Sequence, residues 1–581
     1  MLDAPPGSAS ACPASFDSNM ENNRAGRPRV STEVRPEISS ALEPSPAAAC
    51  PELLINTSPV PAIGVSLTDD SAPCGSQHSH ALNAQLWKAT LDRAVKGIVH
   101  ISYTVVRSFD LDGAGSYNGT GFIVDSALGL ILSNRHVVKT GPVSTTARFN
   151  KYEELTLTPL YFDPVHDFGF FKYDPSKIKY AEVEEIKLCP EAAKVGTEIK
   201  ICGNDAGEHG TIWGSTLARL DRRAPQYDFN TFYIQAASST AVGSSGSPVL
   251  DIFGRAVALH TGGVANSATS LYLPLDRVVR ALRLLQKGKC ITRGTLQTEF
   301  VHLSYDELKK LGLPDEIEYE SRKRNEHSKG LLTVHQVIPE GPCSVVLQVG
   351  DVLVKCYHPA FGERYIENFV SLWEIIDESI GDTIVLTILR GNDLKVIEAK
   401  VQDLNHLIPH TFLEVMDGIV HPISYHVARQ FFLPCRGLFV AASGMSMIPN
   451  RCLIRQIDNT DINSLDDIVK IFQSTPHGKR ISIRYRKLDT GTEVFYYLMI
   501  DKRFFCMTLF HRKENSWERE VVRFESPPVQ ETAMTRLKVG SQVTWKAHLR
   551  ARLLRVHCRV PYQVQVKSQH LYIDIVGSAC W

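Results

Sequence analysis

A series of short β-rich runs separated by turn residues extends from about Ile98 to Leu275, and it restricts the fold more than any other feature of the sequence. The runs are "VHISYTVV", "TGFIVD", "GLILSN", "ELTLTPLYF", "FGFFKYD", "EIKICGN", "TFYIQAA", "SPVLDIFG" and "AVALHTGG". Many short strands with turn signals between them are typical of an all-β barrel or sandwich. A helical stretch precedes the series, and the amphipathic stretch "LPLDRVVRALRLLQKG" closes it. The sequence therefore predicts a mainly β domain over residues 81–289.

Two later segments of the chain resemble each other. "SKGLLTVHQVIPEGPC" begins at Ser328 and "CRGLFVAASGMSMIPN" begins at Cys435, with Gly330 and Gly437 at matching places. Each segment is followed by a helical stretch and then by a strand. Because solenoid repeats have periods of about 20–50 residues, this longer period indicates two copies of one α+β domain. We predict the copies over residues 290–402 and 403–505 and assign no structure to residues 506–581.

Length and composition limit the number of domains and the class of partner. At about 150 residues per domain, a chain of 581 residues suggests about four units. Residues 1–80 are rich in Pro, Ala, Ser and Gly, which predicts a disordered tail. The 63 Lys and Arg residues balance the 63 Asp and Glu residues, so no surplus of charge favours nucleic acid or an anionic membrane as a partner.

Targeting signals and cysteine usage both indicate an intracellular protein. The first thirty residues lack the basic region and apolar run of a secretory signal, and no segment approaches the ~20 apolar residues of a membrane span. The 13 cysteines are scattered, without a CxxC pair or zinc-like spacing. We therefore expect reduced thiols in the cytosol or nucleus, and no metal.

The stretch "TAVGSSGSPVLD" contains three serines within four residues, and a polar turn is its simplest interpretation. A nucleophilic serine needs a histidine that accepts its proton and a carboxylate that orients the histidine. His136 in "LILSNRHVVKTG" and Asp167 in "YFDPVHDFGFFKYD" supply these residue types beside apolar strands, although Asp163 and His166 compete for a role in the second stretch. Three such residues at strand–loop junctions of one β-rich segment favour catalysis over a simple linker.

The glycines of this turn select one of its serines. Gly243 lies two residues before Ser245, where glycine lets the chain fold back so that the N–H groups of both residues point into one oxyanion hole. Gly246 follows the selected serine. The sequence thus predicts Ser245 as the nucleophile and the N–H groups of Gly243 and Ser245 as the oxyanion donors.

These motifs resemble a known family. "GTGFIVD", "NRHVV", "DPVHDFGF", "GNDAGE", "RLDRRAP", "DFNTFYIQAA" and "GSSGSPV" are similar in sequence, order and spacing to motifs of the HtrA/Deg serine proteases, and in particular of the fungal nuclear HtrA-like enzymes described as pro-apoptotic. The resemblance runs from about Trp87 to Phe505. It implies a chymotrypsin-like double β-barrel protease domain followed by two PDZ-like α+β domains, the second degenerate. It further implies His136, Asp167 and Ser245 as the catalytic triad, assembly as a trimer, and a location in the nucleus or cytoplasm.

The sequence departs from the family pattern at three points. Many family members carry "GNSGGP" at the nucleophile, whereas this chain has "GSSGSP", with Ser247 in place of a glycine. Gln297 stands where a carboxylate-binding loop usually has glycine, which argues against capture of a free C-terminus by the first PDZ-like domain. The fungal enzymes continue into a second protease-like half that has no counterpart here, so we expect a shortened or diverged form.

The resemblance also implies a specificity pocket. Ser239, six residues before Ser245, corresponds to its floor, and the strand "ALHTGG", which contains His260 and Gly262, corresponds to the edge that pairs an extended substrate. Because Ser239 carries no charge, cleavage after small or medium apolar residues is favoured over cleavage after Lys or Arg.

The resulting hypothesis is an intracellular serine endopeptidase that cleaves unfolded or regulatory proteins through an acyl-enzyme, without metal or cofactor. Peptides are possible ligands of the first PDZ-like domain. The alternative is a non-catalytic PDZ-bearing scaffold or chaperone-like binding protein on a protease fold.

Overall fold

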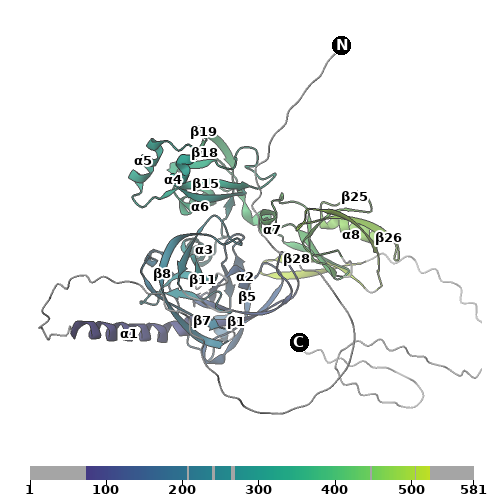
Figure 1. The fold of residues 1–581 in the computed structure, drawn as a ribbon. Helices are drawn as coiled ribbons and strands as arrows, with labels where there is room; N and C mark the ends of the chain where they lie inside the picture. Colours follow the sequence, from purple (N-terminus) through teal and green to yellow (C-terminus); the bar gives the residue numbers. More distant parts are fainter. Residues whose placement is uncertain are drawn as a thin grey trace, which may run out of the picture. The chain divides into compact units, whose positions relative to one another are not determined.

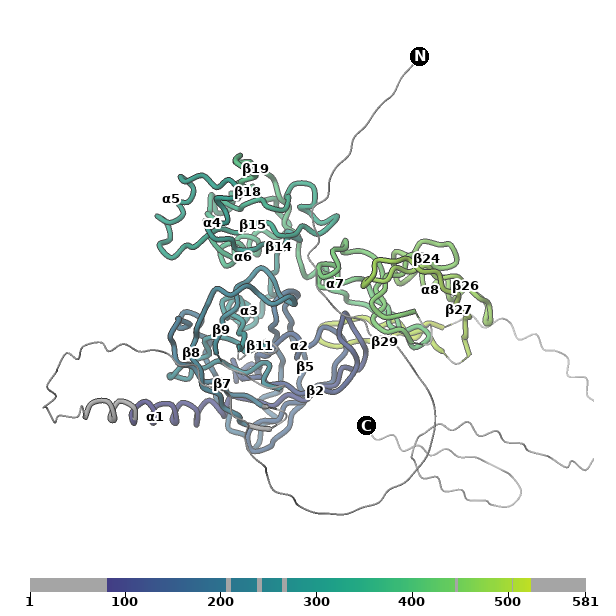
Figure 2. Tube along the Cα trace, in the orientation of Figure 1, coloured from purple at the N-terminus to yellow at the C-terminus, as the bar shows by residue number. Residues whose placement is uncertain are grey.

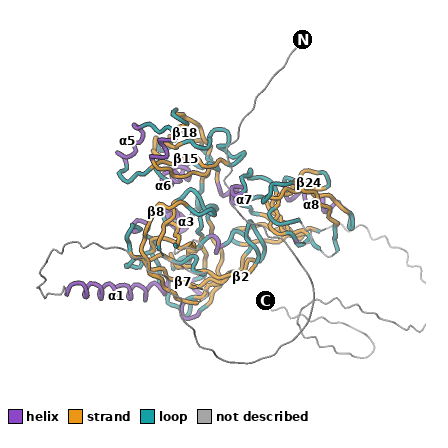
Figure 3. Tube along the Cα trace, viewed as in Figure 1, coloured by secondary structure: helices purple, strands orange, loops and turns teal. Residues whose placement is uncertain are grey.

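The computed structural model describes residues 74–523 except 206–207, 238–242, 264–268, 445–447 and 504. Strands predominate in this part of the chain (Figures 1 and 3). The α-helices are α1 (Cys74–Ala94), α2 (Arg135–Val138), α3 (Asp276–Gln286), α4 (Tyr305–Lys310), α5 (Asp315–Arg324), α6 (Phe369–Glu378), α7 (Tyr425–Gln430) and α8 (Leu465–Ser474). The 3-10 helices are η1 (Val95–Gly97), η2 (Asn150–Tyr152), η3 (Pro175–Lys177), η4 (Pro190–Ala192) and η5 (Leu404–Leu407). Most of the predicted disordered tail lies outside the described residues, and α1 begins within its last part.

Two closed antiparallel barrels form the first domain. The first barrel has the strand order β1-β2-β3-β6-β5-β4, and the second has the order β10-β11-β12-β9-β8-β7. The first set comprises β1 (Ile98–Val105), β2 (Gly115–Asp125), β3 (Leu130–Ser133), β4 (Val143–Arg148), β5 (Glu154–Phe162) and β6 (Gly169–Lys172). The second comprises β7 (Glu198–Asp205), β8 (Glu208–Arg223), β9 (Phe232–Ala236), β10 (Pro248–Leu250), β11 (Ala256–Gly263) and β12 (Ser270–Pro274). Closure removes free strand edges, and the predicted double β-barrel is confirmed.

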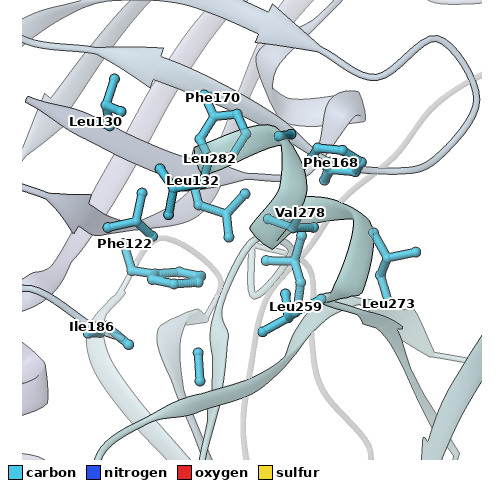
Figure 4. Packing of buried hydrophobic residues seen from close by; sticks show 14 of the residues in the cluster. Phe122, Leu130, Leu132, Phe168, Phe170, Ile186, Leu259, Leu273, Val278 and Leu282 are labelled. Carbon is cyan, nitrogen blue, oxygen red and sulfur yellow. The ribbon is translucent and has the colours of Figure 1, made fainter. Parts of the chain in front are cut away.

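A shared hydrophobic cluster joins the two barrels to α3 (Figure 4). Phe122 and Leu132 come from the first barrel, Leu259 and Leu273 from the second, and Val278 from α3, and all five side chains are buried. Burying one such side chain stabilises a fold by about 1.5–3 kcal/mol. The cluster therefore fixes one barrel against the other and sets the distance between loops that the two barrels contribute.

The two predicted repeats share the order of their strands and of all their helices but one. Figure 2 colours both repeats by residue number. In each, a strand leads to a short helix, two further strands, a very short strand, a longer helix and two last strands, and the first repeat carries an additional helix, α5, after its short helix. The first repeat contains β14 (Thr298–Ser304), β15 (Gly330–Val337), β16 (Val352–His358), β17 (Gly362–Tyr365), β18 (Thr383–Arg390) and β19 (Asp393–Lys400). The second contains β22 (Gly418–Pro422), β23 (Leu438–Ala442), β24 (Cys452–Ile457), β25 (Thr460–Asp461), β26 (Arg480–Lys487) and β27 (Glu493–Met499).

The longer helices of the repeats begin in the same way. Asn368 and Ser371 form a capping box at the start of α6, and Ser464 and Asp467 form one at the start of α8. Each cap is worth about 1 kcal/mol because it satisfies N–H groups that the helix leaves unpaired. The shared cap and element order confirm the repeat that the sequence predicted.

The second repeat extends beyond residue 505, where we expected it to end. β21 (Thr411–Val415) pairs with β22 on one side and with β28 (Met507–Lys513) on the other, and β28 pairs in turn with β29 (Ser516–Val522). Most side chains of β29 are exposed, so this strand lacks the apolar face by which a sequence pattern reveals a strand. A two-stranded pair of β13 (Gly294–Thr295) and β20 (Gln402–Asp403) closes the first repeat.

Within the described ranges, no helix combines the length and the apolar character that crossing a membrane requires.

Candidate active site

His136 is placed by a short helix that directly follows a buried strand. All four residues of β3 are buried, and Val137 and Val138 of α2 are buried as well. These contacts fix α2 against the first barrel, whereas the His136 side chain remains 40 % exposed. A histidine held in this way combines a fixed backbone with an accessible ring, as a general base requires.

The Asp167 carboxylate is hydrogen-bonded to Nδ1 of the His136 ring. Its carboxylate oxygens lie 2.8 Å and 3.0 Å from His136 Nδ1, and Oδ1 also accepts the His136 backbone N–H at 3.1 Å. The Asp167 side chain is only 2 % exposed. Because a carboxylate accepts hydrogen bonds, Nδ1 carries the ring proton and Nε2 is left as the acceptor.

The electrostatics of this pair keep the carboxylate ionised. Burial by itself raises the pKa of Asp167, but the charge of His136 and the hydrogen bonds from it outweigh burial, and the pKa lies below its usual value. An ionised carboxylate both selects the Nδ1–H tautomer and stabilises an imidazolium. The pair therefore has the chemistry of a base and the group that orients it.

The turn before β10 needs its glycines. Gly243 and Gly246 have φ of +106° and +89°, a region that L-residues with side chains rarely occupy. A Cβ added to Gly246 would lie 2.0 Å from the Thr120 carbonyl oxygen and 2.4 Å from Ser133 Oγ. The turn thus packs against the first barrel, which brings the Ser245 segment to the same side of the domain as β2 and β3.

The three serines of this turn have different environments. Ser244 and Ser247 are buried: Ser244 Oγ lies 3.1 Å from His260 Nε2, and Ser247 Oγ donates to the Ser244 carbonyl at 2.6 Å. Ser245 is partly exposed, and its Oγ donates to the Thr261 carbonyl at 3.4 Å rather than to His136. Of the three hydroxyls, that of Ser245 is the accessible one, and a side-chain rotation must precede its transfer of a proton to His136.

The predicted specificity pocket is only partly described. Ser239 lies outside the described residues. His260 is fully buried, and burial, followed by the charge of His136, lowers its pKa to about 3, so it is neutral at pH 7. Gly262 has open space where a Cβ would stand. In this structure His260 is therefore buried against Ser244 instead of lining an open pocket, whereas Gly262 faces accessible space.

Asp163 and His166, the competing residues of the Asp167 loop, are both engaged elsewhere. Asp163 accepts the backbone N–H groups of Val165 and His166 and forms an ion pair with Arg293 at 2.7 Å. His166 Nδ1 lies 2.8 Å from a carboxylate oxygen of Asp228. Both side chains are buried, and they hold the loop that carries Asp167 instead of facing His136.

Arg293 connects this loop to the first PDZ-like repeat. Besides Asp163, its guanidinium faces Asp377 of α6 at 3.6 Å, and Asp377 also binds Arg277 at 2.9 Å. Burial opposes the ionised form of Asp163, but the charge of Arg293 outweighs it and lowers the pKa of Asp163. Sequence reasoning missed Asp228, Arg293 and Asp377, because nothing in an isolated charged residue shows that it is buried beside a partner far along the chain.

A small apolar cluster packs against the same loop. Val165 and Phe229 of the protease domain contact Ile338 of the first repeat, Leu404 of η5 and Tyr425 of the second repeat. The loop that carries Asp167 is thus held by side chains from both repeats as well as by its own hydrogen bonds. In the described part of the chain, no three His, Cys, Asp or Glu side chains converge as a metal site would require.

Comparisons with known proteins match two parts of the chain to described domain families. A family model described as a trypsin-like peptidase domain matches residues 119–259, which contain His136, Asp167 and Ser245, and one described as a PDZ-like domain matches residues 406–478. The chain is 44 % identical over 423 residues to Protease Do-like 7 of Arabidopsis thaliana, covering 69 % of this chain and 38 % of the relative.

Fungal relatives cover more of the chain. It is 38 % identical over 502 residues to the pro-apoptotic serine protease NMA111 of Yarrowia lipolytica, covering 82 % of this chain and 50 % of the relative. The chain therefore spans half or less of the length of these curated relatives. Among solved structures, the HtrA-type protease AlgW with tripeptide is similar over 54 % of this chain and 96 % of that chain, with a TM-score of 0.42 and 18 % identity. By these matches the chain contains a trypsin-like peptidase domain and a PDZ-like domain, and it is similar to the named serine protease relatives over 69–82 % of its own length.

Proposed function

We propose that this chain is a serine endopeptidase that works through an acyl-enzyme, with Ser245 as nucleophile, His136 as base and Asp167 as the group that orients His136. The observation that carries the proposal is the hydrogen-bonded His136–Asp167 pair, in which His136 Nδ1 lies 2.8 Å and 3.0 Å from the two carboxylate oxygens. The same domain carries Ser245 in a partly exposed turn. A binding platform has no physical requirement for such a pair, because orienting an imidazole serves proton transfer.

In the proposed mechanism, Ser245 Oγ attacks the peptide carbonyl carbon while its proton passes to His136 Nε2. The N–H groups of Gly243 and Ser245 bind the oxygen that becomes negatively charged. The intermediate collapses when the imidazolium donates its proton to the leaving amine, which leaves the peptide's acyl group on Ser245. A water molecule, deprotonated by His136, then attacks the ester and releases the acid.

The proposed substrates are unfolded or regulatory protein segments, cleaved after small or medium apolar residues at a pocket to which Ser239 and Gly262 contribute, whereas His260 is buried. Peptides are proposed as ligands of the first PDZ-like domain. Its Gln297 has a φ of +49°, and the backbone N–H of Gln297 already donates to Thr295 Oγ1 at 2.9 Å, which favours internal segments over free C-termini. Trimeric assembly and a location in the nucleus or cytoplasm remain proposals that rest on the family.

A fluorophosphonate probe, which reacts with activated serines, tests the proposed activity. The wild-type chain should be labelled and should hydrolyse an unfolded protein substrate, whereas Ser245→Ala and His136→Ala should do neither. Ser116→Ala is the matched control, because it removes an exposed hydroxyl of β2 in the same domain and should be labelled like the wild type. If wild type and Ser245→Ala are labelled equally, with or without added peptide, the catalytic proposal fails and the non-catalytic scaffold takes its place.

A further inference from the structure

The peptide group between Ser244 and Ser245 is held by its carbonyl oxygen. Ser244 O accepts the backbone N–H of Ser247 at 3.1 Å and the Ser247 hydroxyl at 2.6 Å. A trans peptide group is planar, so its C=O and its N–H point in opposite directions. Two hydrogen bonds that fix the Ser244 carbonyl therefore also fix the direction of the Ser245 N–H, one of the two proposed oxyanion donors.

The Ser247 hydroxyl occupies a space made for it. Ser247 is fully buried, and its own carbonyl accepts the His260 backbone N–H at 3.0 Å. Opposite it in β7, a Cβ added to Gly203 would lie 2.0 Å from Ser247 Oγ. The absence of a side chain at Gly203 thus compensates for the presence of one at Ser247, where the related motif "GNSGGP" has glycine.

The carbonyls on either side are held as well. Thr120 Oγ1 donates to the Gly243 carbonyl at 2.9 Å, and the Thr120 backbone N–H donates to the Ser245 carbonyl at 2.8 Å. Thr120 Oγ1 in turn accepts the Asn204 backbone N–H at 3.0 Å. Three successive carbonyls of the turn are therefore anchored, and Ser247 anchors the middle one by both its backbone N–H and its hydroxyl.

We propose that Ser247 is a positioning residue, whose hydroxyl holds the Ser244–Ser245 peptide so that the Ser245 N–H faces the oxyanion. This inference rests on the proposed protease function. An oxyanion donor must lie about 2.7–3.1 Å from the charged oxygen, so a rotation of this peptide removes one donor from the transition state while it leaves the bound substrate largely unaffected. Alanine or glycine at this position removes the shorter of the two Ser247 hydrogen bonds to the Ser244 carbonyl and keeps the longer backbone one, so the peptide is held less firmly against that rotation.

The test compares Ser247→Ala and Ser247→Gly with wild type in the full-length chain, by hydrolysis of a fluorogenic peptide and by inhibition with a peptide boronate. Boronates form a tetrahedral adduct with the nucleophile, so their affinity reports on the oxyanion donors. We expect kcat and boronate affinity to fall together by roughly 5- to 100-fold, between the effect of one buried hydrogen bond and that of a whole oxyanion donor, with KM changed by less than about twofold.

Ser379→Ala is the matched control. Ser379 is also a fully buried serine whose hydroxyl donates to a backbone carbonyl, that of Ile375 at 2.8 Å, but it lies in the first PDZ-like repeat. The Ser379→Ala variant should be less stable than the wild type, as Ser247→Ala is, but its kcat and its affinity for the boronate should equal those of the wild type.

Two results would overturn the inference while leaving the protease function intact: both Ser247 variants keep kcat and boronate affinity within about twofold of wild type, or they raise KM without lowering kcat. A wild-type chain that neither hydrolyses the peptide nor reacts with a fluorophosphonate would refute the proposed function itself, and the role of Ser247 with it.

Discussion

The buried ion pairs of Arg293 predict that this residue controls the stability of the loop that carries Asp167. Its side chain is 4 % exposed and lies between two buried carboxylates, 2.7 Å from Asp163 and 3.6 Å from Asp377. Arg293→Met keeps most of the side-chain volume but leaves both carboxylates without this cation. Removing one partner of a buried ion pair typically costs about 3–5 kcal/mol, because the remaining charge stays buried.

Hydrogen exchange at two backbone amides measures this cost where it acts. Val165 and His166 donate their N–H groups to Asp163 Oδ1 at 2.9 Å and 2.8 Å, so they exchange only when the loop opens. Since about 1.4 kcal/mol corresponds to a factor of ten, Arg293→Met should accelerate their exchange by at least about a hundredfold. It should also lower kcat, because Asp167 follows this loop directly.

Arg322→Met serves as the control, because Arg322 pairs with Glu318 on an exposed helix surface, where such a pair contributes about 0.3–0.5 kcal/mol. It should leave the exchange of Val165 and His166 unchanged. If Arg293→Met accelerates their exchange by less than about threefold, then Arg293 does not hold the loop and the reasoning is wrong.

Three further predictions follow from the nucleophile turn and the domain contacts. Gly246→Ala should abolish fluorophosphonate labelling and lower the free energy of unfolding by at least about 3 kcal/mol. Its Cβ would lie 2.0 Å from a carbonyl oxygen, and the residue has a positive φ. Labelling at the wild-type rate would contradict this prediction. His260, with a pKa of about 3 when folded and about 6.5 when unfolded, contributes stability that is complete above pH 6.5 and is lost as the pH falls towards 3. Between pH 6.5 and pH 5, the free energy of unfolding should therefore fall by about 2 kcal/mol more in the wild type than in His260→Gln. If denaturation curves show the same fall in both proteins, His260 is not a buried neutral histidine. Phe232 packs against Phe369 of the first repeat, with ring centroids 5.0 Å apart. Phe232→Ala should therefore speed proteolytic cleavage between the protease domain and that repeat. An unchanged cleavage rate would show that the contact adds no stability.

The sequence predicted the elements whose chemistry or periodicity is local. His136, Asp167 and Ser245 each follow or precede an apolar strand, and their residue types are those of one reaction, so the prediction required no knowledge of packing. The structure brings His136 and Asp167 into hydrogen-bond contact and places Ser245 in an accessible turn. The repeat was visible for a similar reason, because both copies carry matching apolar runs and turn residues.

Features that depend on long-range packing could not be predicted in this way. Arg293 and Asp377 look like ordinary surface charges in the sequence, and only the docking of α6 on the protease domain buries them together. His260 was expected in the specificity pocket by the resemblance, but its ring is fully buried with Nε2 3.1 Å from Ser244 Oγ. Ser247 departs visibly from the family pattern, but the sequence does not show that its hydroxyl donates to the Ser244 carbonyl.

Locating the modified residue after fluorophosphonate treatment tests the central claim most directly. Intact-mass and peptide-level mass spectrometry of the wild-type chain should find one phosphonyl group per chain, attached to Ser245, and none in the Ser245→Ala or His136→Ala variants. No modification of the wild-type chain, or modification of Ser244, Ser247 or another serine in its place, would contradict the assignment of the nucleophile and of the site built around it.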